Sequence, residues 1–302
     1  MSKRILILAS AEDAESTQIN DNFVARVQAG IDDDVQIEWH NYRDICIWFK
    51  TGTIEVSLLS TGELLSMFDF VYIKSFFRYS EYAAAIAAYL DQQHIPYVCT
   101  ELRNHIALTK ITQFVRLSQA GIPIAKTLLL HPAHYVAQYD RVVERLGLPF
   151  IFKSTDGSGG DENYLINSQA ELEAAIAAHP SLHFVAQSFI ANDSDLRVLI
   201  VGNNIELIIK RTRAGESHLN NTSQGGAAEL VNVDSLPEAH RQLALKAANV
   251  MEREVAGVDL MFESGTGDPY VLEVNASPQI GSGAFMDEKV AIYCKYFINM
   301  VQ

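Results

Sequence analysis

The chain has 302 residues and a mass of 33.5 kDa, enough for about two domains or one large one. Its 37 acidic residues outnumber 23 Lys and Arg, and the resulting net charge of −14 at pH 7 argues against binding to nucleic acid or to anionic membranes. With 48% hydrophobic and 20% charged residues, the composition excludes a mostly disordered chain.

The beginning of the chain shows no targeting segment. Its first apolar run, over residues 4–9, is too short for the core of a signal peptide. No other stretch approaches the roughly 18 apolar residues of a membrane-spanning helix. The three cysteines lie far apart with no CxxC spacing, which predicts neither a disulfide framework nor a zinc site. We therefore expect a cytoplasmic protein.

The first hundred residues alternate strands and helices. Short apolar runs predict strands over residues 4–9, 35–39, 70–73 and 96–99. Helices are expected over 18–29, ending at Gly30, and from an N-cap at Ser80 to residue 93. This order predicts an open α/β domain with parallel strands, residues 1–103. No G-x-G-x-x-G follows the first strand, so we place no nucleotide there.

Two smaller α+β units are expected to follow, over residues 104–187 and 188–302. The first has predicted helices over 104–120 (ending at Gly121), 135–146 and 169–178, and predicted strands over 123–130, 149–153 and 183–187. Ser168 and Glu171 form a capping-box pattern. The second has predicted strands over 195–201, 205–211, 257–263 and 270–278, and predicted helices over 237–254 and 288–300.

The last two predicted strands carry the strongest local signal. If their turn-rich connection centres on Thr266, Asp259 lies opposite Glu273, with Asn275 on the same face. The other face, directed to the core, is expected to hold Val258, Leu260, Leu272 and Val274. Two unpaired carboxylates this close repel each other, and oxygen ligands of this kind select Mg²⁺. The alternative is an ordinary solvated strand face.

Two further segments indicate anion binding. Lys153 ends a buried strand and runs into a glycine-rich loop, and this combination can hold polyphosphate, although the loop is not a Walker A motif. Arg197 and Arg211 lie on the hairpin around Gly202, where they could neutralise phosphate or oxyanion charge. The alternatives are a surface loop with a solvated lysine and ordinary surface ion pairs.

Taken together, these features resemble the ATP-grasp carboxylate–amine ligases, and most closely the RimK-like branch that adds glutamate to ribosomal protein S6. The resemblance covers residues 104–285 and rests on DLR, KR, NNTSQGGAA, AGVDLMFE and VLEVNASPQIG. It implies an ATP-grasp fold of mixed α/β and α+β class. An N-terminal open α/β (pre-ATP-grasp) domain is then followed by two α+β lobes with the nucleotide between them.

The resemblance also assigns roles to individual residues. It makes Asp259, Glu273 and Asn275 the ligands of Mg²⁺, with Mn²⁺ as an alternative. The implied catalytic groups, which face the transferred phosphate and the acyl intermediate, are Arg197, Arg211 and Asn221. The implied nucleotide-binding residues are Lys110, Lys153, Gly157, Ser158, Gly159, Gly160, Gln187, Ser188, Phe189, Asp195 and Lys210.

The activity implied by the resemblance is amide-bond formation driven by ATP. A carboxylate takes the γ-phosphoryl group to give an acylphosphate, and an amine then displaces the phosphate. The expected substrates are ATP, an amine and the carboxylate of a peptide, protein or amino acid. Two alternatives stay open: a small-molecule or peptide-crosslinking ligase of secondary metabolism, and a non-catalytic ATP-binding module. Relatives in this family commonly form dimers or tetramers, so the resemblance allows a homo-oligomer.

Overall fold

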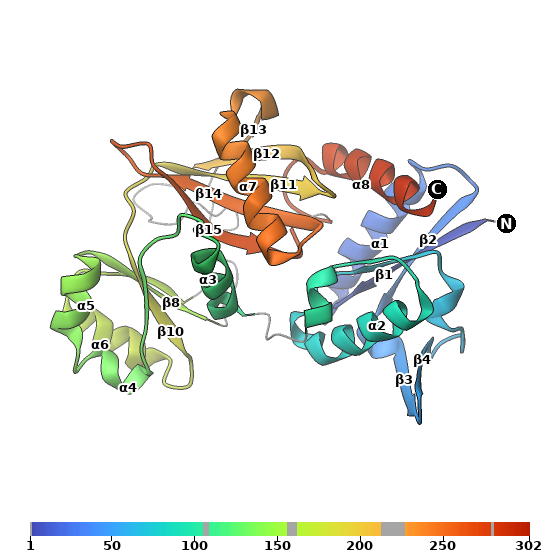
Figure 1. The fold of residues 1–302 in the computed structure, drawn as a ribbon, viewed down its shortest axis with the longest axis horizontal. Helices are drawn as coiled ribbons and strands as arrows, with labels where there is room; N and C mark the ends of the chain where they lie inside the picture. Colours follow the sequence, from blue (N-terminus) through green and yellow to red (C-terminus); the bar gives the residue numbers. More distant parts are fainter. Residues whose placement is uncertain (1, 105–108, 156–161, 213–226, 279–280) are drawn as a thin grey trace.

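A computed structural model describes the chain except for residues 1, 105–108, 156–161, 213–226 and 279–280 (Figure 1). The described residues form three larger sheets and a separate two-stranded hairpin. Each larger sheet belongs to one of the three segments expected from the sequence. No helix in the described part of the chain combines the length and the apolar character that a bilayer crossing requires.

The N-terminal domain contains the predicted parallel sheet. Its strand order is β2-β1-β5-β6, and all three neighbouring pairs are parallel. The strands are β1 (Lys3–Ala9), β2 (Val35–Asn41), β5 (Phe70–Ile73) and β6 (Tyr97–Val98). The helices are α1 (Ala14–Gln28) and α2 (Ser80–Gln93). A protruding hairpin of β3 (Ile45–Lys50) and β4 (Thr53–Leu58) was not expected (Figure 1).

Two local expectations in this domain were wrong, and one glycine has a packing role that was not expected. Helix α1 begins four residues early because the Asp13 carboxylate accepts a hydrogen bond from the Ser16 amide and caps it there. Ser80 is the first helical residue of α2, and Tyr79 holds the N-cap position without a side-chain bond. The helix ends before Gly30 as expected, with Ala29 at the C-cap, but Gly30 does not have a left-handed backbone. A Cβ there would lie 2.8 Å from the Cys294 Sγ, so close packing requires the glycine.

The central lobe is an antiparallel sheet in the order β7-β10-β8-β9. Its strands are β7 (Thr127–Leu129), β8 (Phe150–Ser154), β9 (Asn163–Ile166) and β10 (Phe184–Ser188). One face packs on α4 (Pro132–Tyr135), α5 (Tyr139–Leu146) and α6 (Gln169–Ala178). The helix predicted over 135–146 is therefore divided, and the strand predicted over 123–130 has only three residues. Ser168 caps α6 as expected, whereas the Glu171 carboxylate bonds to the Asn167 amide.

Helix α3 (Lys110–Gln119) connects this lobe to the next. It is shorter than the expected 104–120, because the Thr109 hydroxyl caps its first turn. Residues 105–108 of the expected helix lie outside the described part. Gly121 ends the helix with φ +66°, and the Ile122 amide bonds back to the Leu117 carbonyl. The helix packs on α7 (Glu238–Met251), and the Gln113 Oε1 accepts a hydrogen bond of 2.9 Å from the Val274 amide.

The C-terminal lobe is a five-stranded antiparallel sheet in the order β13-β12-β11-β14-β15. Its strands are β11 (Ser194–Val201), β12 (Asn204–Thr212), β13 (Ala227–Val231), β14 (Val255–Phe262) and β15 (Pro269–Asn275). Helix α7 (Glu238–Met251) packs on one face through Ala244, Ala247 and Ala248. A change of register after Asp259 turns Val271 to that core, and Leu272 packs instead near Met261. The expected core position of Leu272 was therefore wrong.

The last helix joins the C-terminal lobe to the N-terminal domain. Helix α8 (Met286–Val301) lies against α1 (Figure 1), and its Tyr293 and Phe297 share a core with Phe70, Tyr72 and Leu199. The first parallel sheet and the last antiparallel sheet therefore pack on the same helix. The exact boundaries of the three domains stay a prediction.

Candidate active site

The predicted pairing of the two acids on the last hairpin is confirmed, although nearer the turn the register differs by one residue from the predicted one. Asp259 pairs with Glu273, and Gly257 pairs with Asn275. The Asn275 Nδ2 donates hydrogen bonds to the Glu273 Oε1 at 2.9 Å and to the Gly257 carbonyl at 3.3 Å. The two carboxylates and the carboxamide therefore lie together on one face of β14 and β15.

The two predicted arginines meet these acids directly. Arg197 on β11 donates from Nε and Nη2 to the two carboxylate oxygens of Asp259, both at 2.7 Å. The Arg211 Nη2 on β12 lies 3.0 Å from the Asp259 Oδ2, and its Nε donates to the Asp195 Oδ1 at 2.6 Å. The premise of two unpaired carboxylates was therefore wrong for Asp259, which two arginines neutralise. Glu273 has a weaker partner, with the Arg197 Nη2 at 3.9 Å.

The pairing keeps the buried cluster ionised. Burial alone would raise the pKa of Asp259, but Arg197 and Arg211 outweigh it and lower the pKa to about 2. Burial raises the pKa of Asp195, with Asp259 adding to the effect and Arg211 opposing it. Two arginines and two aspartates balance in charge, so Glu273 contributes the excess negative charge of the cluster.

Two lysines face this cluster from the other side. Lys153 on β8 is half-buried, with its ammonium 5.6 Å from the centre of the Phe114 ring. Its burial lowers the pKa to about 8, with Glu273 opposing and Lys110 reinforcing the shift. The Lys110 Nζ, at the start of α3, donates to the Ser154 carbonyl at 3.1 Å. Cations of the central lobe and the Glu273 carboxylate of the C-terminal lobe are thus electrostatically coupled.

The predicted residues of the connecting segment lie at the end of β10. The Gln187 Nε2 donates to the Thr127 Oγ1 at 2.6 Å, and the Ser188 amide donates to the Lys126 carbonyl at 2.9 Å. Phe189 follows directly and is half-buried. All three lie where the chain passes from the central lobe to the C-terminal lobe, which is the place that the resemblance implies for adenine.

Not every predicted residue is brought to the cluster. Lys210 pairs with Glu229 at 3.1 Å, and it alternates with Arg211 along β12, so its side chain takes the opposite face. The remaining candidates lie outside the described residues; they are Gly157, Ser158, Gly159, Gly160 and Asn221.

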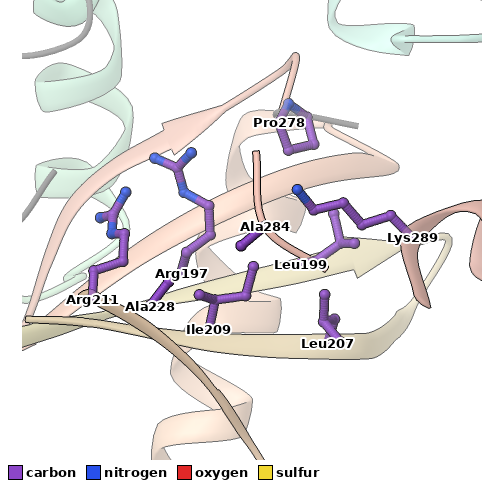
Figure 2. Close-up of a pocket in the computed structure, with 9 residues that line it drawn as sticks. All are labelled: Arg197, Leu199, Leu207, Ile209, Arg211, Ala228, Pro278, Ala284 and Lys289. Atoms are coloured by element: carbon purple, nitrogen blue, oxygen red, sulfur yellow. The ribbon is translucent and has the colours of Figure 1, made fainter. Parts of the chain in front are cut away.

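A pocket adjoins the arginines and contains a cation that the sequence did not indicate (Figure 2). Its lining residues are Arg197, Leu199, Leu207, Ile209, Arg211, Ala228, Pro278, Ala284 and Lys289. Lys289 is 5% exposed and donates from Nζ to the Ser282 carbonyl at 3.0 Å. No local motif marks this lysine, because the packing of α8 between two domains brings it there.

The N-terminal domain reaches the same neighbourhood at the end of β5. The Ser75 amide donates to the Ser277 Oγ at 2.8 Å, just beyond β15. The adjacent Lys74 is buried and donates from Nζ to the Asn20 Oδ1 at 2.9 Å. Burial lowers the pKa of Lys74 from 10.5 to about 8.

This shift predicts a pH-dependent stability. Between about pH 8 and 10.5 the unfolded chain binds the Lys74 proton and the folded chain does not, so the contribution of Lys74 to stability rises with pH over this range. Lys74→Met removes the effect. In urea unfolding, we measure the free energy of unfolding of the variant minus that of wild type. We expect this difference to be up to about 3 kcal/mol lower at pH 10 than at pH 7. An equal difference at both pH values would contradict the assignment. The lost hydrogen bond to Asn20 lowers the free energy of unfolding at both pH values, so it does not contribute to the difference between them.

The donor set of the acidic cluster fits a hard divalent cation. Asp259, Glu273 and Asn275 offer only oxygen ligands, and the Glu273 side chain is 35% exposed on the open side of the cluster. In the described part of the chain, no group of three or more His, Cys, Asp or Glu forms a different metal site. These three residues are the ones that could hold Mg²⁺.

Comparison with known sequences gives a consistent result. A family model described as a RimK-like ATP-grasp domain matches residues 107–297. A probable alpha-L-glutamate ligase of Cellvibrio japonicus is 30% identical over 221 residues, which is 72% of this chain and 71% of the relative. The ribosomal protein bS6–L-glutamate ligase of Escherichia fergusonii is 32% identical over 177 residues, which is 57% of this chain and 56% of the relative.

Solved structures share the whole architecture. D-alanyl-alanine synthetase A of Vibrio cholerae matches with a TM-score of 0.72 at 17% identity, over 100% of this chain and 98% of that chain. The ATP-grasp ligase PsnB, in a complex with a precursor variant, Mg and ADP, matches with a TM-score of 0.70 at 15% identity, over 100% and 99%. At this level of identity the likeness concerns the fold alone, and it confirms the fold class expected from the sequence.

Proposed function

We propose that this chain, which belongs to the RimK-like ATP-grasp family, uses ATP to join the carboxylate of a peptide or protein to an amine. The coarser activity follows from the family: the chain is an ATP-dependent carboxylate–amine ligase. The choice of substrate and the role of each residue form the proposal.

The observation that carries the residue assignment is the meeting of opposite charges between two lobes. Lys110 and Lys153 lie on the central lobe, and the acidic cluster with Glu273 lies on the C-terminal lobe. ATP brings several negative charges that need cations, and the lysines supply them. Glu273, Asp259 and Asn275 would hold Mg²⁺, which when bound neutralises charge on the phosphates. Among the described residues, the lysines of the central lobe would thus contact the phosphates, and the oxygen ligands of the C-terminal lobe would hold the metal ion.

The proposed chemistry takes two steps, and neither needs a covalent enzyme intermediate. An oxygen of the substrate carboxylate attacks the γ-phosphorus of ATP, the bond from that phosphorus to the bridging oxygen breaks, and ADP leaves. The amine nitrogen then attacks the acyl carbon, the bond from that carbon to the phosphate oxygen breaks, and the amine loses a proton to solvent. Arg197 and Arg211 would stabilise the negative charge that develops on the acyl oxygen and on the departing phosphate.

Asp195 and Asp259 hold both guanidinium groups in place for this role. Arg197 contacts Asp259 through Nε and Nη2. Arg211 contacts Asp195 through Nε and Asp259 through Nη2. The Nη1 of each guanidinium therefore contacts neither aspartate. A donor that is fixed before the reaction costs no reorganisation during it. We infer that Asp195 acts as a positioning residue for Arg211 rather than as a direct contact of the nucleotide.

The substrate class is proposed from the relatives and neighbours. One relative is named for glutamate ligation to ribosomal protein bS6, and PsnB is described with a precursor peptide. A peptide or protein carboxylate therefore has more support than a free metabolite. An ATP-binding module without catalysis is disfavoured, because the relatives are named as ligases and the arginines and acids lie together in one cluster.

The test is formation of ADP that depends on both a carboxylate and an amine. Purified protein with Mg²⁺ and ATP is given a set of short peptides and free amino acids, and ADP and the amide product are quantified together. We expect ADP and amide in equal amounts, with peptides preferred over free amino acids. ADP that forms at the same rate without any carboxylate would contradict the proposal.

A further inference from the structure

The pocket beside the arginines contains one cation whose charge is not balanced by an acid. Arg197 and Arg211 are paired with Asp259 and Asp195. Lys289, by contrast, has no ion pair with any described residue, and its hydrogen bond goes to a neutral carbonyl, that of Ser282. The Lys289 ammonium can thus donate further hydrogen bonds, at a position that is largely shielded from water.

Burying a lysine ammonium without an acidic partner lowers the stability of the folded chain. Removing an ammonium from water costs several kcal/mol unless an anion compensates it, as general transfer data show. Burial and the nearby Arg197 guanidinium both lower the pKa of Lys289, to about 8. The two cations Arg197 and Lys289 line the same pocket, so an anion placed between them would satisfy both.

The remaining walls of the pocket are apolar. Leu199 on β11 and Leu207 and Ile209 on β12 form one side, and they lie beneath the cationic ends in Figure 2. Ala228, Pro278 and Ala284 complete the lining. A second carboxylate directed at these walls would lose its hydration with no partner, whereas an aliphatic group would be favoured.

We propose that this pocket binds the reacting carboxylate of the substrate between Lys289 and Arg197, and that it selects an aliphatic group next to that carboxylate. The proposal rests on the proposed ligase function and deepens it by naming the substrate class: a peptide ending in an aliphatic residue rather than in glutamate. Lys289 is then a substrate-binding residue contributed by α8, a helix that carries none of the proposed metal and nucleotide residues.

The test uses two simple probes, N-acetyl-leucine and N-acetyl-glutamate, with hydroxylamine as the amine. Each probe carboxylate accepts the γ-phosphoryl group of ATP and releases ADP, and hydroxylamine then displaces phosphate to leave a hydroxamate that can be quantified. For the wild-type protein we expect kcat/KM for N-acetyl-leucine to exceed that for N-acetyl-glutamate by about tenfold or more. This comparison needs no variant.

The role of Lys289 is tested with Lys289→Met, and Lys295→Met is the matched control because Lys295 is an exposed lysine on the same helix. Loss of a charged hydrogen bond predicts a rise of about 10- to 100-fold in KM for N-acetyl-leucine with Lys289→Met. Lys289→Arg should recover part of that loss. The dissociation constant of ATP, measured by calorimetry, should stay within about threefold in all three variants.

Direct binding separates this inference from the proposed function. N-acetyl-leucine is titrated calorimetrically into the protein with Mg²⁺ and a non-hydrolysable ATP analogue, and we expect heat with wild type and Lys295→Met but not with Lys289→Met. Binding without hydroxamate would overturn the ligase function and support the pocket. Hydroxamate formation that prefers N-acetyl-glutamate, or that is unchanged in Lys289→Met, would overturn the pocket and support the ligase function.

Discussion

Glu273→Gln is expected to reduce magnesium-dependent ADP formation by about a thousandfold while the fold stays intact. Glu273 is the acid of the cluster with the weakest internal partner, since the Arg197 Nη2 lies 3.9 Å away. Its charge is therefore available to a cation, whereas the charge of Asp259 is already shared with two arginines. Removing one preorganised charge at a phosphoryl-transfer site typically costs about 10²–10³ in rate, and loss of a metal ligand adds to that.

The readout is the rate of ADP release against Mg²⁺ concentration, together with the thermal midpoint. Glu263→Gln is a suitable control, because Glu263 lies just beyond the far end of β14 on the same hairpin. We expect the control to keep the wild-type rate. A Glu273→Gln protein with normal turnover and an unchanged Mg²⁺ requirement would show that the metal site lies elsewhere.

The pairing of Asp259 with Glu273 was predicted correctly, but a turn centred on Thr266 does not by itself produce it. Next to the turn Leu260 pairs with Val271, one residue away from the predicted register, and the bulge beside Asp259 restores that register. For Leu272 the prediction was wrong. The shift of register after Asp259 reverses the face of the residues beyond it, and no residue type in the strand marks the bulge. The carboxylate pair and the core face of the strand therefore both depend on a bulge that the local sequence pattern does not show.

The pairing of Arg197 and Arg211 with the acids required long-range information. The two arginines lie on β11 and β12, and they reach Asp259 because β11 pairs with β14, a neighbour about 60 residues away along the chain. Composition indicated that local cations were unusual in so acidic a chain. Only the strand order shows that Arg197 lies directly opposite Asp259.

Lys289 and the position of α8 could not be predicted for the same reason. The apolar pattern of α8 indicates a helix, but it does not say which sheet the helix covers. Tyr293 and Phe297 pack with residues of the first parallel sheet and of the last antiparallel sheet together. The pocket therefore depends on the packing of α8 against both of these sheets.

Arg253→Met is expected to be the most destabilising single change proposed for this chain. Arg253 and Glu101 form a fully buried ion pair, with the Arg253 Nε 2.7 Å from the Glu101 Oε1. Arg253 also donates to the Val274 carbonyl on β15, the strand that carries Glu273 and Asn275. The pair therefore connects the segment after β6, in the N-terminal domain, to the C-terminal lobe beside the acidic cluster.

The expected loss follows from what the variant leaves behind. Glu101 would stay buried without its cation, and breaking a buried pair from one side typically costs about 3–5 kcal/mol. For a chain of this size we expect the thermal midpoint to fall by roughly 5–15 °C. Replacing both partners, with Arg253→Met and Glu101→Leu together, should recover most of the loss, because no uncompensated charge then remains.

The pH dependence separates lost charge pairing from lost packing. Burial already raises the pKa of Glu101 even with Arg253 present, and the variant removes the group that opposes this. A folded-state pKa above the unfolded value means that folding is favoured as pH falls toward it. The destabilisation by Arg253→Met should therefore be smaller at pH 5 than at pH 8, and the double variant should show no such difference. If the single variant loses the same stability at both pH values, the Glu101 charge is not the cause, and Arg253 acts through packing and its bond to Val274.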